Sequence, residues 1–168
     1  MGESGVFFEP RALRMSKRRR GREMALQMLY QSECGRSAGS EVLARFDPSS
    51  FGDDNKNGAG ADAGRRDGRA LEYARELFAG TIEHQQEIDS LIRSQAEHWR
   101  LERMPAVDRN ILRLAAFEFL YEVDVPKLVV INEAIELAKR FGSEDSGRFV
   151  NGLLDGLLKS HAFPGALT

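Results

Sequence analysis

The sequence is poor in the side chains that crosslink a chain or hold a metal ion. Its single cysteine, Cys34, cannot form an intramolecular disulfide, which fits a reducing compartment. The histidines, His84, His98 and His161, lie far apart and show no spacing typical of a zinc site. We therefore predict a fold that needs no disulfide, metal ion or other cofactor.

Long apolar runs are also lacking. No run approaches the ~20 residues that cross a bilayer, and the start of the chain has neither the basic region nor the apolar stretch of a secretory signal. Met15, followed by Ser-Lys-Arg, resembles a natural protein start and is a second candidate for the initiator. We expect a protein that stays in the cytoplasm and has no membrane partner.

Signatures of catalysis are missing as well. The sequence contains no nucleophile elbow, no glycine-rich loop between a strand and a helix, and no histidine paired at helical spacing with another candidate ligand. The glycines between Gly52 and Gly68 lie in an irregular polar segment, which does not resemble a phosphate cradle. Glu133, Glu136 and Asp155 fit solvated helix faces or caps. We predict that the chain is not an enzyme.

The overall charge gives no reason to expect a polyanionic partner. The 168 residues are 42% hydrophobic and 30% charged, with a formal net charge of -2. Such a chain can bury a core of its own, and any affinity for nucleic acid must come from a local cluster of charge.

Apolar residues recur at helical spacing along most of the chain, and no segment alternates with the period of a strand. The pattern predicts an all-α fold of six to seven helices. The expected helices cover 18–32, 40–46, 69–95 as one helix or two that meet near 80–85, 107–121, the stretch after the turn at 124–126 up to 140, and a last helix after 143. The helix at 107–121 is apolar almost all round, so we expect it at the centre of a bundle.

Helix caps are predicted at the junction before the last helix. Gly142 is suited to the position just after a helix, and Ser143 to the N-cap of the next one. Glu144 and Asp145 would then place negative charge in its first turn.

One domain is expected over 17–160, preceded by a flexible tail at 1–16 and followed by a tail at 161–168. Within the domain, the segment at about 47–68 has almost no large apolar side chains. Such a composition cannot offset the entropy lost on ordering, and we interpret the segment as a flexible insertion.

The strongest local asymmetry of charge lies near the start of the domain. Five of six consecutive positions are basic there: Lys17, Arg18, Arg19, Arg20 and Arg22. Closely spaced cations bind phosphates, and arginine offers planar pairs of donors. A solvated, frayed helix start would have the same composition, and both interpretations remain open.

Helix geometry places an aromatic ring beside this cluster. Three apolar residues mark the buried side of the helix: Ala25, Met28 and Leu29. At about 100° per residue, the opposite side carries Arg19, Glu23 and Tyr30, with Arg20 and Gln27 beside them. An exposed tyrosine beside arginines is a plausible site for stacking RNA bases, although a tyrosine is often half-exposed for no special reason.

Phe149 raises the same question on the last helix. It lies about 100° from the centre of an apolar stripe formed by Val150, Leu153, Leu154 and Leu157. Partial exposure and packing at the edge of the core both fit this position.

Several of these segments resemble the NusB family of transcription antitermination factors. The run from Arg18 to Tyr30 resembles the family's opening helix, and 107–120 resembles its central helix. The most specific part is the unbroken stretch formed by 125–142 and 143–155. With the helix from Arg69 the resemblance spans 17–159.

The resemblance implies two packed three-helix bundles and a regulatory function. A family member pairs with NusE, a ribosomal protein of the small subunit, and binds the boxA element of nascent ribosomal RNA. With other Nus factors it helps the transcribing RNA polymerase to read through terminators. Whether the chain forms a homodimer without its partner is left open.

By position in these motifs, the resemblance assigns RNA binding to seven residues: Arg18, Arg19, Arg20, Arg22, Tyr30, Asp145 and Phe149. Lys17, which belongs to the same basic cluster, is predicted to bind RNA with them. Asp145 could either cap its helix or accept a hydrogen bond from a base edge.

Two rivals remain. A related helical domain stands at the front of ribosomal RNA cytosine methyltransferases, whose catalytic domain follows in the same chain; with Thr168 as the last residue, we expect no such domain here. A protein-interaction module whose basic start only adds solubility is the second rival, and RNA affinity that is independent of the arginines would favour neither interpretation.

Overall fold

The computed structural model describes residues 11–48 and 61–168. The elements of this part are α1 (Arg11–Cys34), α2 (Gly39–Arg45), α3 (Ala61–Glu83), α4 (Gln85–Gln95), the 3-10 helix η2 (Leu101–Arg103), α5 (Ala106–Tyr121), α6 (Lys127–Phe141) and α7 (Ser146–Ser160). The expectation of an all-α fold with six to seven helices is confirmed, and over the described ranges seven α-helices are present.

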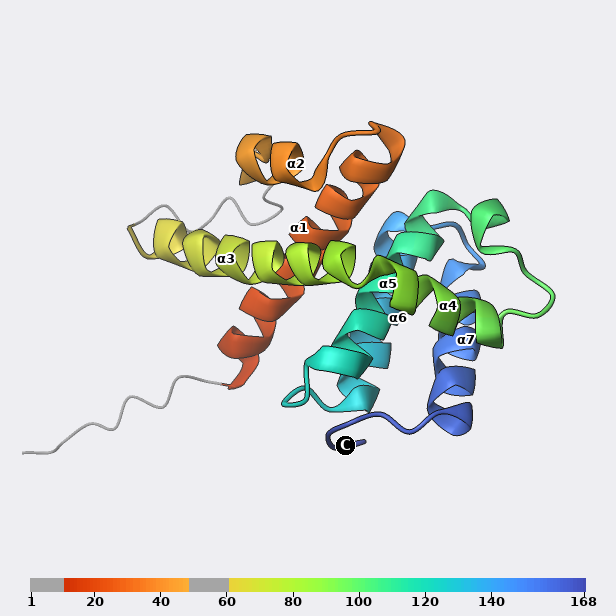
Figure 1. Cartoon of the computed structure of the whole chain (residues 1–168). Helices are drawn as coiled ribbons and strands as arrows, with labels where there is room; N and C mark the ends of the chain where they lie inside the picture. Colours follow the sequence, from red (N-terminus) through yellow and green to blue (C-terminus); the bar gives the residue numbers. More distant parts are fainter. Residues whose placement is uncertain (1–10, 49–60) are drawn as a thin grey trace, which may run out of the picture.

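The helices form two groups that share a central element. Helix α3 crosses α1 and packs along it, and α2 lies against both, whereas α4, α5, α6 and α7 pack together on the other side (Figure 1). Helix α5 contacts α1 and α3 as well as α4, α6 and α7. It buries most of its length at the centre of the fold, as its sequence predicted, but the buried residues include four polar or charged ones: Asp108, Asn110, Arg113 and Glu118.

Two helices begin earlier than their composition suggested. Helix α1 starts at Arg11, inside the expected tail at 1–16, and α3 starts at Ala61, inside the expected insertion at 47–68. Alanine, arginine, leucine and methionine are good helix formers, and each helix gains one backbone hydrogen bond for each residue added once it is nucleated. The remainder of both segments, 1–10 and 49–60, lies outside the described residues.

The question of one helix or two over 69–95 is resolved. Helix α3 ends at Glu83 and α4 begins at Gln85, with His84 between them. Just before this break, α3 packs closely on α5: a Cβ atom on Gly80 would lie only 2.3 Å from the Phe117 ring. The break lets α4 turn from the first group of helices to the second.

The expected caps before α7 are wrong in detail. Gly142 is the C-cap of α6, but its backbone is extended (φ -92°) rather than left-handed. Residue Asp145, not Ser143, takes the N-cap position of α7. The N–H of Ser143 donates instead to Oγ of Ser146 at 2.9 Å. The hydroxyl of Ser146 donates in turn to Oδ1 of Asp108 at 2.7 Å, which ties the start of α7 to the start of α5.

The segment at 161–168 has no helix, yet it is docked on the fold. The Phe163 ring packs 5.1 Å from that of Phe119. The carbonyl groups of Ala166 and Leu167 accept hydrogen bonds from the first backbone N–H groups of α6, which have no partner within the helix. No helix in the described ranges is long and apolar enough to cross a membrane.

Candidate nucleic-acid interface

The basic cluster lies on α1, and its members differ in exposure. Arg18 and Arg19 are exposed, Lys17 and Arg20 are half-buried, and Arg22 is buried. The five cations therefore do not form one uniform surface.

Arg22 belongs to the core rather than to a phosphate-binding surface, which corrects its prediction as an RNA contact. Its Nη2 and Nε atoms donate to Oε1 of Glu118 on α5 at 2.7 Å and 3.0 Å, and both side chains are at most 4% exposed. Burial disfavours the charged form of Arg22, but the Glu118 carboxylate outweighs this effect and raises the pKa of Arg22. Position 22 lies on the same helical side as Ala25 and Leu29, so the spacing of the sequence already indicated that Arg22 would be buried.

Helix α6 covers part of the α1 face that was expected to be open. Arg19 forms a two-pronged ion pair with Glu133, with Nη2–Oε1 at 2.9 Å and Nε–Oε2 at 3.0 Å, yet its side chain remains 49% exposed. Glu23, expected beside it on the surface, is buried and accepts a hydrogen bond from Arg140 at 2.7 Å. Of the predicted trio of Arg19, Glu23 and Tyr30, only the arginine and the tyrosine reach solvent.

Tyr30 is 41% exposed and lies between two hollows. A cavity of about 190 Å³ separates it from Val107 of α5 and Phe141 of α6, and a wider one of about 520 Å³ runs between α1 and α2 past Cys34. A hydrogen bond with Cys34 raises the pKa of the Tyr30 phenol. A tyrosine phenol is uncharged at neutral pH in any case, so the ring does not repel a phosphate.

Asp145 is exposed at the start of α7. It occupies the N-cap position without making a side-chain capping hydrogen bond. Of the two roles left open for this residue, the cap is therefore not used, and its carboxylate faces solvent.

Phe149 is half-buried and packs at the edge of the core. Its ring meets Trp99 edge to face, with centroids 5.7 Å apart and planes at 68°. Trp99 is 63% exposed and is not among the site residues that were predicted from the sequence. A lone tryptophan among charged residues was the signal that could have identified it.

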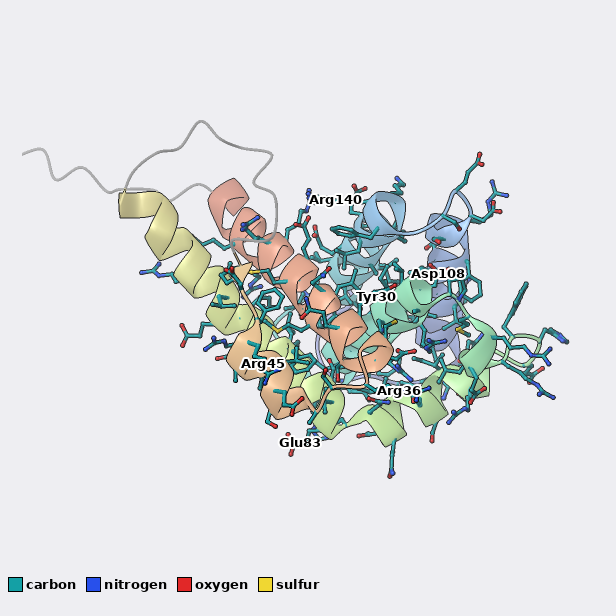
Figure 2. The ribbon with its side chains drawn as sticks, turned by 90° about the horizontal axis from the view of Figure 1, so that it is seen from above. Tyr30, Arg36, Arg45, Glu83, Asp108 and Arg140 are labelled. Carbon is teal, nitrogen blue, oxygen red and sulfur yellow. The ribbon has the colours of Figure 1, made fainter. Side chains whose placement is uncertain are left out.

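The start of α5 connects the α1 surface with the start of α7. Val107 lines the cavity beside Tyr30, and the next residue, Asp108, holds Ser146, the neighbour of Asp145. Figure 2 shows Tyr30 on the side of α1 that faces Arg140 and Asp108. The structure thus brings Tyr30 and Asp145 toward one part of the molecule, although they are far apart in the sequence.

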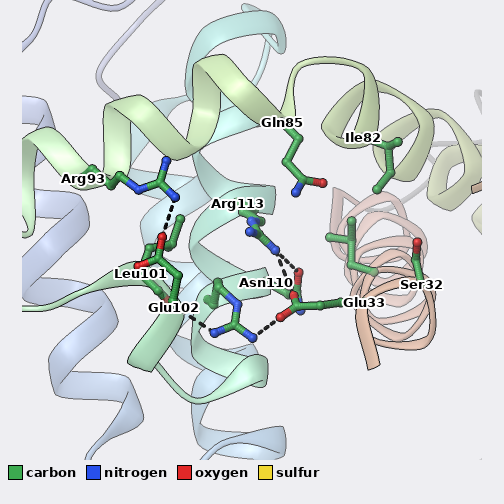
Figure 3. A pocket seen from close by; sticks show the side chains of 11 residues that line it. Ser32, Glu33, Ile82, Gln85, Arg93, Leu101, Glu102, Asn110 and Arg113 are labelled. Carbon is green, nitrogen blue, oxygen red and sulfur yellow. Dashed lines mark hydrogen bonds and ion pairs between the residues drawn. The ribbon is translucent and has the colours of Figure 1, made fainter. Parts of the chain in front are cut away.

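A second polar cluster lies where the two groups of helices meet (Figure 3). Glu33 of α1 accepts hydrogen bonds from Arg109, Asn110 and Arg113 of α5, and Arg113 also forms an ion pair with Asp89 of α4 at 2.7 Å. Burial would raise the pKa of Glu33, but Arg109 and Asn110 bind its carboxylate and lower it. Because these cations are matched by carboxylates, we assign the cluster to the joining of α1, α4 and α5 rather than to phosphate.

No group of histidine, cysteine and carboxylate side chains in the described part of the chain could hold a metal ion.

Comparison with known proteins gives one consistent result. The model of the NusB family matches residues 19–159. Transcription antitermination protein NusB of Myxococcus xanthus is 46% identical over 141 residues, which are 84% of this chain and 94% of that protein. The same protein of Geotalea uraniireducens is 45% identical over 141 residues, with 84% and 93% covered.

Solved structures show the same likeness. T. maritima NusB superimposes with a TM-score of 0.69 and 41% identity, covering 86% of this chain and 92% of the other. A chain from a structure of the antitermination factors NusB and NusE in complex with dsRNA gives a TM-score of 0.68 and 28% identity, covering 88% and 99%.

Proposed function

The chain belongs to the NusB family, a family of transcription antitermination proteins, and from this membership we propose that it binds boxA-type RNA of nascent ribosomal transcripts together with NusE. The bound RNA is single-stranded in this proposal, and the complex helps RNA polymerase, with other Nus factors, to read through terminators. The protein then acts where bacterial ribosomal RNA is transcribed, in the cytoplasm.

The observation that carries the RNA-binding part is the exposure of Arg18, Arg19 and Tyr30 along α1 and of Asp145 at the start of α7. In this proposal the four side chains contribute to one RNA-binding surface. Exposed arginines and an exposed aromatic ring on one helix suit a single strand, whose phosphates are bound by arginine and whose bases stack on aromatic faces. Lys17, Arg20 and Phe149 are half-buried and are kept in the proposal, whereas Arg22 is left out because it is buried.

Membership of this family agrees with the prediction that the chain is not an enzyme. The relatives that carry the name NusB are matched over almost their whole length. The rival based on ribosomal RNA cytosine methyltransferases is not favoured by any of these matches.

Pairing with NusE is proposed from a structural relative. That relative was solved with NusE and with double-stranded RNA, so the form of the RNA has to be tested together with the partner.

The test is a titration of fluorescently labelled RNA, followed by anisotropy, with and without NusE. Three RNAs are compared: single-stranded boxA, the same bases in scrambled order, and a boxA duplex. We expect the single-stranded boxA element to bind most tightly when NusE is present. Equal binding of all three RNAs, or no binding, would refute the proposal.

Two variants locate the surface. Arg18→Ala should weaken binding and lower the slope of log K against log salt by ~0.7 for each phosphate that is no longer neutralised. Tyr30→Ala should cost ~1 to 3 kcal/mol of binding free energy if a base stacks there, whereas Tyr30→Phe should keep most of the affinity.

Arg75 on α3 provides a matched control, since it is exposed and lies outside the surface. Arg75→Ala should leave the affinity and the salt slope nearly unchanged. Arg19→Ala is less clean, because it also leaves Glu133 without its arginine, and it should be interpreted only beside a measurement of folding stability.

A further inference from the structure

The most exposed large aromatic side chain of the described residues has no part in the surface considered so far. Trp99 follows α4, is 63% exposed, and touches Phe149 of α7 with only the edge-to-face contact described above. A tryptophan left in water forgoes a large gain from burial. Its position therefore requires an explanation beyond packing.

Trp99 and Phe149 stand at one cleft between the end of α4 and α7. The cleft has a volume of about 520 Å³ and is also lined by Glu97, His98, Arg148 and Gly152. Gly152 leaves its floor open, because a Cβ atom at that position would meet nothing within 4 Å. A volume of this size lies in the range of clefts that take small ligands.

The chemistry of the lining suits a nucleobase. The indole and phenyl rings present π faces, which every base can stack on. Glu97 can accept a hydrogen bond from an exocyclic amino group, while the exposed Arg148 is placed to meet the adjoining phosphate.

Continuity with the proposed RNA surface favours RNA over a protein partner. Asp145 and Phe149, both assigned to RNA, lie one helical turn apart on α7, and the cleft begins at Phe149. The lining mixes charged groups of both signs with two rings, whereas the core of a protein interface is depleted of charge.

We propose that the cleft between Trp99 and Phe149 binds one base of the single-stranded RNA, stacked on the indole ring. This inference rests on the proposed function and extends its RNA path beyond Phe149 to α4. Trp99 and Gly152 become binding determinants that the sequence did not reveal.

Fluorescence gives a direct test, because Trp99 is the only tryptophan of the chain. Unlabelled single-stranded boxA RNA is titrated into the full chain with NusE. The tryptophan emission is measured before and after each addition, and the signal of NusE alone with the same RNA is subtracted. We expect quenching that saturates at the same RNA concentration as the anisotropy of a labelled RNA.

Variants make the test independent of the spectroscopic signal. Trp99→Ala should weaken RNA binding by roughly 5- to 150-fold, the range for the removal of one stacked base, without changing the salt slope, since the number of neutralised phosphates stays the same. Trp99→Phe should retain most of the affinity. Gly152→Leu should fill the cleft and weaken binding, whereas Gly152→Ala, which adds only one methyl group in open space, should not.

The outcomes separate the two proposals. If labelled RNA binds but the emission is unchanged and Trp99→Ala binds as the wild type does, the cleft holds no base and the proposed function still stands. If Trp99→Ala weakens binding of NusE alone and leaves binding of RNA alone unchanged, the cleft is a protein-docking site and the inference is wrong. If no RNA binds under any condition, both proposals are wrong.

Discussion

The buried ion pair between Arg22 and Glu118 tests whether Arg22 stabilises the core instead of binding RNA with the other cations of the basic cluster. Replacing Arg22 by methionine keeps a long apolar side chain but leaves the Glu118 carboxylate, 2% exposed, without its guanidinium. The remaining donor is the Tyr73 hydroxyl at 3.4 Å, which is too long for a strong hydrogen bond. Removing one partner of such a pair costs ~3 to 5 kcal/mol, because an uncompensated charge stays buried.

The measurement is urea unfolding followed by far-ultraviolet circular dichroism, with thermal unfolding beside it. For a chain of this size, the expected destabilisation corresponds to a decrease in Tm of roughly 6 to 20 °C. Glu118→Leu should be destabilising for the same reason. The double variant Arg22→Met with Glu118→Leu should be destabilised less than either single variant, since it removes both charges.

Two results would refute this reasoning. A destabilisation below ~1 kcal/mol for Arg22→Met would show that the pair is no stronger than a surface salt bridge. A destabilisation of the double variant equal to the sum of the two single effects would show that the groups do not interact. RNA binding of the folded double variant should match that of the wild type, because neither group reaches the surface.

Three further predictions concern stability. Glu33→Gln should lower the free energy of unfolding by ~1 to 3 kcal/mol at neutral pH; because the pKa of Glu33 is lowered from its ordinary 4.5, this difference should persist above that value and shrink as the pH falls through the lowered pKa. Gly80→Ala should cost ~1 to 3 kcal/mol, since the added Cβ would lie 2.3 Å from Phe117. Ser146→Ala should cost ~1 to 3 kcal/mol, because Asp108 is buried and loses its hydroxyl donor.

Each of these is checked by urea unfolding, the first as a series over pH. Gly152→Ala serves as the control for Gly80→Ala and should be neutral or stabilising by up to ~1 kcal/mol, because alanine favours the helix and nothing is crowded. A constant difference between Glu33→Gln and the wild type at all pH values would contradict the ion-pair interpretation. Unchanged stability of Ser146→Ala would mean that solvent replaces the missing donor.

Helix identity was accessible from the sequence because apolar spacing is a local property. The apolar stripe of α7 and the buried central position of α5 both follow from residues within one helix, and both were predicted correctly. Helix ends were less accessible. The starts at Arg11 and Ala61 depend on propagation through residues with no apolar period.

Which charged residues are buried and which are exposed could not be predicted from the sequence of one helix alone. Glu23 faces away from the apolar stripe of α1, but α6 lies over that face and Arg140 reaches it. The partner is more than a hundred positions away in the sequence, so only the tertiary fold reveals the pair. Arg22 differs, because its place on the stripe could have been recognised in advance.

Trp99 shows a different limit. It lies in no regular helix, so periodicity assigns it no face, and the cleft beside it arises from two elements that meet only in the folded chain. Exposure of a single side chain outside regular structure depends on its three-dimensional neighbours alone.

The central place of α5 determines how the molecule can come apart. Because this helix lies against both groups, a cut between α4 and α5 would leave α1, α2 and α3 with an uncovered apolar face. We therefore expect neither half to be stable by itself, and unfolding to proceed as one cooperative transition in which calorimetric and van't Hoff enthalpies agree. Protease fragments that end within the η2 segment should accordingly be found as nicked pairs that remain associated rather than as free domains.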